Sequence, residues 1–441
     1  MADLDLIQIG EVIRKVRKSR GLRLEDLADQ KISPATVSNI ERGVPHVGSE
    51  KVLYLLDKLG ISLQQIPEIL EEENEKLEEL LTQLMAVESK LNIIDNQRLL
   101  NQLNELPIDD QHKLAAYRHY LMGRCYFNLK DLKRAERAYY HAIRLSGQSS
   151  YSKEKNIEAL SFNELGICSF YQNDLEQAIQ YTESALDAVN GDSTDQYKFA
   201  CNKAAYLEKL GRIGETVKIV QELWEHIDKM DLDVALNLYD VRVNVFRKSK
   251  MFEEAIQCAK EGIEKARLND KKDRLFELWT ALGSVYLSTQ DWNKAETCFQ
   301  TAVEIGEAID LKIVLVSTYT KLGILYIRQQ KEKEAEESLN RAIQLGKDAN
   351  NAIALTYAHL VMGDLKQTQE KWKESSDFYK QSLELSRKFR NKTLEYKALF
   401  RLAKLKKGDS QEEFLSVLEN IYEVAAAIAE ESKEEESDEI L

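Results

Sequence analysis

The sequence contains very little proline, and none at all in its longest part. Its four prolines are Pro34, Pro45, Pro67 and Pro107, and the 334 residues that follow Pro107 contain none. Because proline interrupts and terminates helices, its absence fits a run of long helices joined by short polar turns. Charged residues make up 31% and hydrophobic residues 43% of the chain, which is typical of a soluble, helix-rich protein. The composition therefore predicts an all-α fold.

Cysteine and long apolar runs are also scarce. The five cysteines, at positions 125, 168, 201, 258 and 298, are scattered and form no Cys-x2-Cys motif, and no His-x3-His pair accompanies them. An odd number of cysteines without such spacing predicts reduced core thiols in a cytoplasmic protein, with neither disulfides nor a metal site. The acidic N-terminus lacks the apolar core of a signal peptide, and no stretch approaches 18 apolar residues. We therefore expect no secretion signal and no contact with a membrane.

Catalytic motifs are missing as well. The six histidines form no recognisable constellation, no glycine-rich phosphate loop is present, and no Ser/His/Asp set is suggested. The sequence therefore predicts no catalytic residues, no cofactor and no enzymatic activity.

The net charge of −14 at first argues against a nucleic-acid partner. However, residues 1–70 hold ten basic and ten acidic groups, so the excess of acid lies downstream. Phosphate contact depends on local charge. Six basic residues gather near the N-terminus: Arg14, Lys15, Arg17, Lys18, Arg20 and Arg23. At the other end the acidic segment 431–441 is expected to be disordered.

Local signals predict five short helices in residues 1–66. The first spans Leu6–Ser19 and the second Leu24–Lys31. Ser33 is a predicted N-cap with Pro34 in the first helical position, and this third helix runs to Arg42 before Gly43. Ser49 is expected to cap the fourth helix and Ser62 to open the fifth. The segment from Ile9-Gly10 to Ile40-Glu41-Arg42-Gly43 resembles the XRE (phage-repressor) helix-turn-helix family.

This resemblance implies that residues 1–66 bind double-stranded DNA. The spacing of Ala28, Val37 and Ile40 packs the second and third helices together and leaves the other face of the third helix free. In the family that face enters the major groove and reads base edges. The implied DNA-binding residues are Arg17, Lys18, Arg23, Ser33, Ala35, Thr36, Ser38, Asn39 and Arg42. An alternative is a helical knob that has lost DNA binding and serves as an interface.

Residues 67–110 allow two interpretations. Leu70, Leu77, Leu84 and Leu91 follow a heptad, which favours a dimerising helix. A degenerate leading helix pair, at about 74–92 and 96–106, explains the same leucines.

From residue 111 to about 430 one pattern recurs. Counted from a small residue, it begins at positions 123, 166, 204, 243, 283, 323, 363 and 403, so that the last four steps are 40 residues each. The clearest copy has Trp279, Leu282, Gly283, Tyr286, Ala295, Phe299 and Ala302. This resembles the tetratricopeptide (TPR) pattern, although the usual period is about 34 residues. We expect a TPR-like α-solenoid of about eight repeats, with another type of α-solenoid as the alternative.

The first helix of each TPR pair lines the concave face, which suits an extended peptide. Asparagine is the residue to expect there, because its amide can bond a peptide backbone irrespective of side chain. The predicted peptide-binding residues are Asn163, Asn202, Asn237, Asp240, Asn244, Arg247, Thr280, Ser284, Thr320, Lys321 and Tyr357. Arg247 or Lys321 could hold a peptide carboxylate. For each residue the alternative is a solvated helix face.

The combination resembles the peptide-responsive quorum-sensing regulators of Gram-positive bacteria, the Rap–Rgg–NprR–PlcR group, and the NprR type most of all. The resemblance implies a short signalling peptide as ligand and a homodimer whose arrangement depends on it. Three functions follow from these signals: a peptide-controlled transcriptional regulator, a response-regulator-binding or phosphatase-like protein of a sporulation phosphorelay, and a scaffold without a small ligand.

Overall fold

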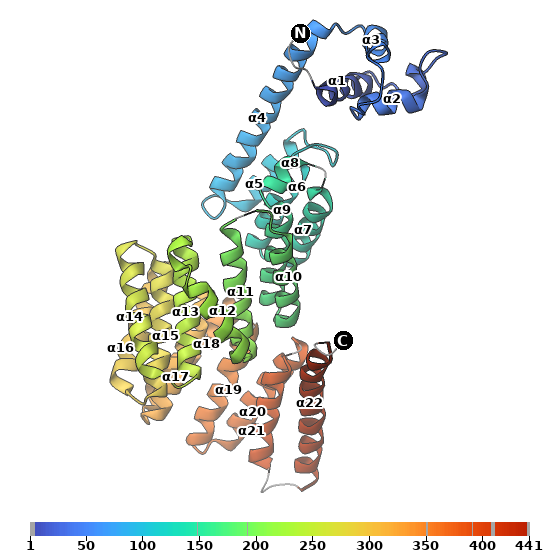
Figure 1. Cartoon of the computed structure of the whole chain (residues 1–441). Helices are drawn as coiled ribbons and strands as arrows, with labels where there is room; N and C mark the ends of the chain where they lie inside the picture. The colour runs from blue at the N-terminus through green and yellow to red at the C-terminus, as the bar shows by residue number, and fades with distance from the viewer. Residues whose placement is uncertain are drawn as a thin grey trace. The chain divides into compact units, whose positions relative to one another are not determined.

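A computed structural model describes residues 5–147, 149–191, 193–349, 352–389, 391–406 and 411–438. All regular elements within these ranges are helical, as Figure 1 shows, which confirms the predicted all-α class. The contacts between residues divide the chain into two units, 1–130 and 131–441. No helix among the described residues is long and apolar enough to cross a membrane.

The first unit begins with four short helical elements. They are α1 (Leu6–Ser19), η1 (Glu25–Leu27), α2 (Pro34–Glu41) and α3 (Ser49–Lys58). Their shared core contains Val12, Ile13, Val37 and Leu55, all fully buried. At Gly10 the backbones of α1 and α2 touch, because a Cβ there would lie 2.4 Å from the Ile40 carbonyl oxygen. A side chain at this position would therefore push α1 away from α2.

The predicted second helix, Leu24–Lys31, is wrong in extent. Only one 3₁₀ turn forms, and Ala28 is already extended. The reason is local competition from aspartates, whose carboxylates bond to nearby backbone N–H groups. Asp26 accepts from the Arg23 N–H, and Asp29 accepts from the N–H groups of Lys31 and Ile32. The other predicted helices form, although Gly48 rather than Ser49 is the N-cap of α3.

The remainder of the first unit consists of η2 (Leu63–Gln65), α4 (Ile66–Lys90), α5 (Asn96–Glu105) and α6 (Ala115–Asn128). Helix α4 is continuous over 25 residues. Its start packs into the first core through Ile66, and its end buries Leu84 and Val87 where α4 meets α5 and α6. This packing favours the degenerate helix pair over the heptad, since Leu84 has neighbours within its own chain.

The second unit is a continuous array of helices. Its elements are α7 (Leu132–Ser146), α8 (Ser150–Glu154), α9 (Ile157–Tyr171), α10 (Leu175–Ala188), α11 (Asp195–Leu210), α12 (Ile213–Trp224), η3 (Ile227–Lys229), α13 (Leu232–Lys248), α14 (Phe252–Leu268), α15 (Lys272–Ser288), α16 (Trp292–Ala308), α17 (Lys312–Arg328), α18 (Glu332–Asp348), α19 (Ala352–Thr368), α20 (Trp372–Lys388), α21 (Lys392–Lys406) and α22 (Gln411–Asp438). All eight predicted small-residue positions lie on the expected first helices, namely α6, α9, α11, α13, α15, α17, α19 and α21.

The 40-residue period now has a geometric explanation. Helices α13 to α20 are 17 residues long, and three-residue links join them, so that each pair occupies 40 residues. Where the structure describes the middle residue of a link, it has a left-handed backbone, as at Lys250, Asp270 and Gln290. Because three residues already make a tight link, the residues beyond the usual TPR period lie in the helices. The extra helix α8 accounts for the longer step between positions 123 and 166.

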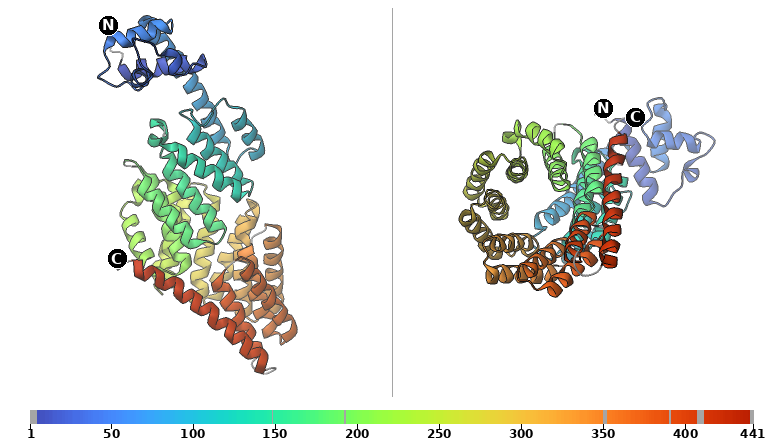
Figure 2. Two further views of the ribbon diagram at one scale, coloured as in Figure 1. Left: turned by 90° about the vertical axis from the view of Figure 1, so that its right-hand side faces the viewer. Right: turned by 90° about the horizontal axis from the view of Figure 1, so that it is seen from below.

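The first helices line the inner side of the array. Helix α13 contacts both α11 and α15 directly, and α17 contacts α19, so first helices pack more closely together than second helices do. Figure 2 shows the helices from green to red following a curved path around a central axis. The path returns close to itself, since Asn391 before α21 donates a hydrogen bond of 3.2 Å to Asn173 after α9. The array therefore has a concave face built by α9, α11, α13, α15, α17, α19 and α21.

Helix α22 continues to Asp438 and so includes most of the acidic segment 431–441, for which disorder stays a prediction. The segment is rich in glutamate, a good helix former, and it extends a helix that has already been nucleated. Residues 439–441 lie outside the described residues.

Candidate functional site

Helix α2 presents the predicted base-reading face. The Ser33 hydroxyl caps it by accepting the Thr36 N–H at 3.2 Å, and it also lies 3.0 Å from the Thr36 hydroxyl. Val37 and Ile40 are buried, whereas Ala35 is exposed. Thr36, Ser38 and Asn39 are half-buried on the helix. Short polar side chains thus stand on the outer face of a helix that is well anchored, as a major-groove reader requires.

Arg42 lies beside that face and is exposed. Its Nη2 donates to the Asn39 Oδ1 at 2.5 Å, and its Nε donates to the Ser38 carbonyl at 3.3 Å. This bond uses one acceptor site of the Asn39 amide, and its Nδ2 donors and second Oδ1 lone pair can still meet a base edge.

Arg17 has a structural position rather than a surface one. Its Nε and Nη2 donate to the two Glu41 carboxylate oxygens at 2.5 and 2.9 Å, and its Nη1 donates to the Leu22 carbonyl at 2.8 Å. Only 11% of the Arg17 side chain and 6% of the Glu41 side chain are exposed. The ion pair joins α1 to α2, so three bonds within the domain already hold the Arg17 guanidinium, which we expected to contact DNA.

Lys18 and Arg23, the other predicted phosphate contacts, are exposed. The Lys18 ammonium donates to the Gln111 side chain at 3.0 Å. Asp29 is an anion in the same region, and it accepts bonds from Tyr54 and Lys58 at 2.7 and 2.8 Å. The Lys58 bond, followed by that from Tyr54, lowers the pKa of Asp29, so this carboxylate stays charged and bound within the domain.

The concave face of the array brings the predicted asparagines together. The Asn202 amide on α11 donates to the Asn163 Oδ1 on α9 at 2.8 Å. Asn163 is completely buried, and its own Nδ2 has no hydrogen-bond partner among the described residues. Asn237 on α13 donates to the Cys201 sulfur at 3.4 Å. Amides from three successive first helices therefore form a row.

The strongest predicted cluster is present on α13. Asn244 donates to the Asp240 carbonyl at 3.1 Å, and Arg247 donates to the Asn244 Oδ1 at 3.4 Å. The Arg247 Nε is buried without a hydrogen-bond partner in the part of the chain that the structure describes. Burial, with help from the negative charge of Glu277, raises the pKa of Asp240 to about 7.

Lys321 on α17 belongs to the same cluster. Burial lowers its pKa to about 8, and the positive charge of Arg247 acts in the same direction. The charges of Glu277, Glu208 and Lys209 also reach Asp240, although these three residues were not among those predicted from the sequence. Glu277 and Glu208 occupy positions six before and four after the small residues Gly283 and Ala204. The same spacing that picked Asn237 and Arg247 could have found them.

Three predicted peptide-binding residues lie between helices instead of on an open surface. Thr280, Ser284 and Thr320 are 8%, 7% and 1% exposed. Thr320 donates to the Val316 carbonyl and Ser284 to the Thr280 carbonyl, both in their own helices, while the Thr280 hydroxyl lies 3.2 Å from that of Thr318. Small hydroxyl residues are satisfied by backbone in this way, so these three pack neighbouring first helices together. Tyr357, by contrast, is 36% exposed.

Among the residues that the structure describes, the thiols and carboxylates do not gather into a metal site. All five cysteines are free and buried, and burial raises the pKa of each thiol, to about 11 for Cys125 and about 12 for Cys298. In the described part of the chain no three metal-binding side chains lie together. These thiols are therefore poor nucleophiles and serve as core residues.

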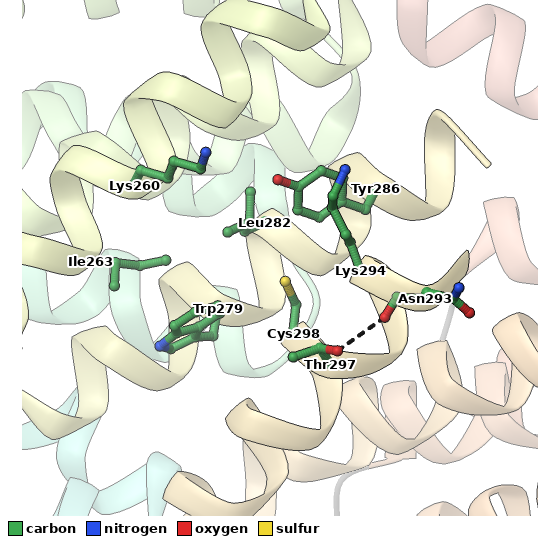
Figure 3. A pocket seen from close by; sticks show the side chains of 9 residues that line it. All are labelled: Lys260, Ile263, Trp279, Leu282, Tyr286, Asn293, Lys294, Thr297 and Cys298. Atoms are coloured by element: carbon green, nitrogen blue, oxygen red, sulfur yellow. Dashed lines mark hydrogen bonds between the residues drawn. The ribbon is translucent and has the colours of Figure 1, made fainter. Parts of the chain in front are cut away.

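A separate pocket of about 410 Å³ lies between α14, α15 and α16 (Figure 3). Its apolar lining includes Ile263, Trp279 and Leu282, and Lys260 and Lys294 also border it. Figure 3 also shows the bond of 3.1 Å from the Thr297 hydroxyl to the Asn293 carbonyl. The pocket is suited to an apolar side chain, and no sequence pattern pointed to it.

Two family models match parts of the chain. Residues 13–66 match the model described as helix-turn-helix. Residues 114–190 and 274–348 match the model described as tetratricopeptide repeat. A comparison with curated protein sequences gave no match.

Three solved structures have a similar fold. The crystal structure of NprR in complex with its cognate peptide NprX is 14% identical, covers 78% of this chain and 98% of its own, and has a TM-score of 0.56. The apo form of the quorum sensor NprR from B. thuringiensis is 16% identical, covers 80% and 98%, and has a TM-score of 0.52. A Rap protein complexed with competence and sporulation factor is 17% identical, covers 76% and 98%, and has a TM-score of 0.52. The chain thus has an NprR-like architecture, in which a helix-turn-helix domain is followed by a tetratricopeptide array.

Proposed function

We propose that the chain is a cytoplasmic transcriptional regulator, and that a short signalling peptide bound on the concave face controls its DNA binding and oligomeric state. The observation that carries the proposal is the pairing of an exposed reader helix, α2, with a polar concave face built by α9, α11, α13 and α17. Neither matched family model describes a catalytic domain, which supports a regulator rather than an enzyme.

The DNA-binding part of the proposal rests on α2 and its surroundings. Ala35, Thr36, Ser38 and Asn39 would meet base edges, while Arg42 and the exposed Lys18, Arg23 and Ser33 would meet the backbone. One reader helix covers only a half-site, so specific binding requires two copies of the chain. The domain boundaries at residues 66, 110 and 430 remain predictions.

The peptide part rests on the asparagine row. Asn163, Asn202, Asn237 and Asn244 offer amide donors and acceptors at successive helices, as a peptide backbone requires. NprR and a Rap protein, whose fold this chain shares, were both solved with peptides or factors bound. A peptide that binds more tightly to one superhelical pitch of the array would shift the array towards that pitch. The shift would move the two ends of the array relative to each other.

A homodimer is part of the proposal. Helix α22 exposes Leu415, Leu418 and Tyr422, with 52%, 38% and 76% of each residue accessible. Apolar side chains gathered on one helix commonly meet a partner. Light scattering with and without peptide tests this part, and a monomer under both conditions would contradict it.

The decisive experiment measures DNA and peptide binding in the same protein. Full-length chain is used to select DNA sites from a random duplex pool, and binders are selected separately from a pool of short synthetic peptides. We expect Asn237→Ala and Asn244→Ala each to weaken the selected peptide by about 1–3 kcal/mol while leaving peptide-free DNA binding intact. The control is Asn340→Ala, at an exposed position of α18. Unchanged peptide affinity in both variants would contradict the proposed site.

The shared fold with a Rap protein supports a second candidate, a response-regulator-binding protein of a sporulation phosphorelay. Size-exclusion chromatography with phosphorylated response regulators tests it. Co-elution without any selected DNA site would favour this candidate over the first.

A further inference from the structure

Two half-buried cations on the concave face, Arg247 and Lys321, have few partners. The Arg247 Nε is buried without a hydrogen bond, and the nearest acceptor of its Nη2 is the Asn244 side chain at 3.4 Å. Lys321 is half-buried, and none of the hydrogen bonds or ion pairs between described residues involves its ammonium. Because buried polar donors are usually paired, the unfilled Arg247 Nε points to a ligand, and the accessible Lys321 ammonium can join it.

The acidic groups of the same surface do not neutralise these cations. Glu277 is paired with Arg274 at 2.7 Å, and Glu208 is paired with Lys248 at 2.8 Å. Asp240 remains, and its raised pKa of about 7 leaves it only partly ionised near neutral pH. Lys209, whose charge also reaches Asp240 and Lys321, adds to the positive side. The surface between α11, α13, α15 and α17 thus has an excess of positive charge.

We propose that Arg247 and Lys321 form a carboxylate-binding subsite for the peptide, an inference that rests on the proposed function. The charges of this guanidinium and this ammonium reach each other, and such a pair is matched to a carboxylate, which Arg can bind in a bidentate manner. The carboxylate is either the C-terminus of the peptide or an Asp or Glu side chain.

The neighbouring amide row gives this subsite a direction. Asn163 is completely buried and holds Asn202 through its Oδ1, whereas the half-buried Asn202 and Asn237 each keep a second amide N–H that can donate to a carbonyl oxygen. The donors from α11 and α13 would hold the peptide backbone, and the cations on α13 and α17 would fix a negative group beyond it. The two kinds of donor together select an extended peptide with a carboxylate at one place.

The test uses three pools of short random peptides with full-length protein. One pool has free C-termini and no Asp or Glu, the second is C-terminally amidated but contains Asp and Glu, and the third is amidated and lacks both. Retained peptides are quantified by mass spectrometry. We expect preference for the first or the second pool over the third by about tenfold to a hundredfold, and the preferred pool identifies the source of the carboxylate.

Variants connect the preference to the two cations. Arg247→Gln and Lys321→Gln should each reduce it by about tenfold or more, whereas Arg247→Lys should retain part of it. The control Lys380→Gln removes an exposed lysine from α20 and should change nothing. Circular dichroism establishes that each variant is folded, and a variant that fails to fold is replaced by Arg247→Lys or Lys321→Arg.

The outcomes separate this inference from the proposed function. Equal retention of all three pools, or a preference that survives in both glutamine variants, overturns the carboxylate subsite and leaves peptide binding in place. Retention of no pool overturns both.

Discussion

Replacing Glu41 by glutamine should destabilise the helix-turn-helix domain far more than a surface substitution would. Glu41 receives two bonds from Arg17, at 2.5 and 2.9 Å, and its side chain is 6% exposed. The substitution leaves the Arg17 guanidinium buried with an uncharged partner. Removing one member of a buried pair costs about 3–5 kcal/mol. A large share of the stability of a small domain would therefore be lost.

The double replacement Arg17→Met with Glu41→Leu removes both charges, so it separates the effect of an unpaired charge from the effect of losing the ion pair itself. Because no unpaired charge then remains, most of the lost stability should return. The assay is amide hydrogen exchange of α1 and α2 in the full chain. In Glu41→Gln, exchange in these helices should accelerate by roughly 10²–10³-fold, while α13 to α20 exchange as before.

The single variant Arg17→Met, which leaves Glu41 unpaired, decides whether Arg17 contacts DNA. If Arg17 binds phosphate, Arg17→Met reduces the slope of log DNA affinity against log salt concentration by about one. It also leaves amide hydrogen exchange in α1 unchanged. We expect the opposite, namely faster exchange and an unaltered salt dependence. The first result would refute the structural role of Arg17.

Three further predictions concern other parts of the chain. Asn39→Ala should relax base preference at one position of a selected DNA site by about 1–3 kcal/mol, whereas Arg42→Ala should weaken binding to all DNA sequences alike. Binding to single-base variants of that site distinguishes the two. Gly283→Ala places a methyl group 2.7 Å from the Phe299 ring, so the midpoint of thermal unfolding should fall by the equivalent of about 1–3 kcal/mol. An unchanged midpoint would mean that the ring moves aside freely. The affinity for carboxylate-bearing peptides should fall as the pH rises from about 7 to about 9, because Lys321, with a pKa of about 8, loses its charge in this range. Amidated peptides without acidic residues should show no such fall.

Much of the fold was predictable because its signals are local. Ser33 and Pro34 start α2 and Gly43 follows its end, so the reader helix depends on neighbours within a few positions. The array was predictable because a small residue recurs every 40 residues, where a first helix must approach its neighbours closely. Both signals can be read without knowledge of tertiary contacts.

The site was less predictable because its partners are distant in sequence. Arg17 pairs with Glu41, 24 positions away, and no local pattern indicates that a basic residue in a basic cluster is buried. Thr320 fits the spacing of a concave residue, yet its hydroxyl bonds to its own helix. The helix predicted at 24–31 failed because two aspartate side chains compete for its backbone. Spacing places a residue on a face, and only the packing decides whether that face is open.

The most direct test of peptide control is DNA affinity measured with and without saturating peptide. Full-length protein is titrated with its selected DNA site, alone and with the peptide retained from the pools, in the original protein and in Asn244→Ala. Because coupling between two sites is reciprocal, the peptide should change DNA affinity by at least about fivefold, and DNA should change peptide affinity by the same factor. In Asn244→Ala the peptide concentration needed for this effect should rise, with peptide-free DNA affinity unchanged. The same DNA affinity and the same oligomeric state at saturating peptide would contradict the account.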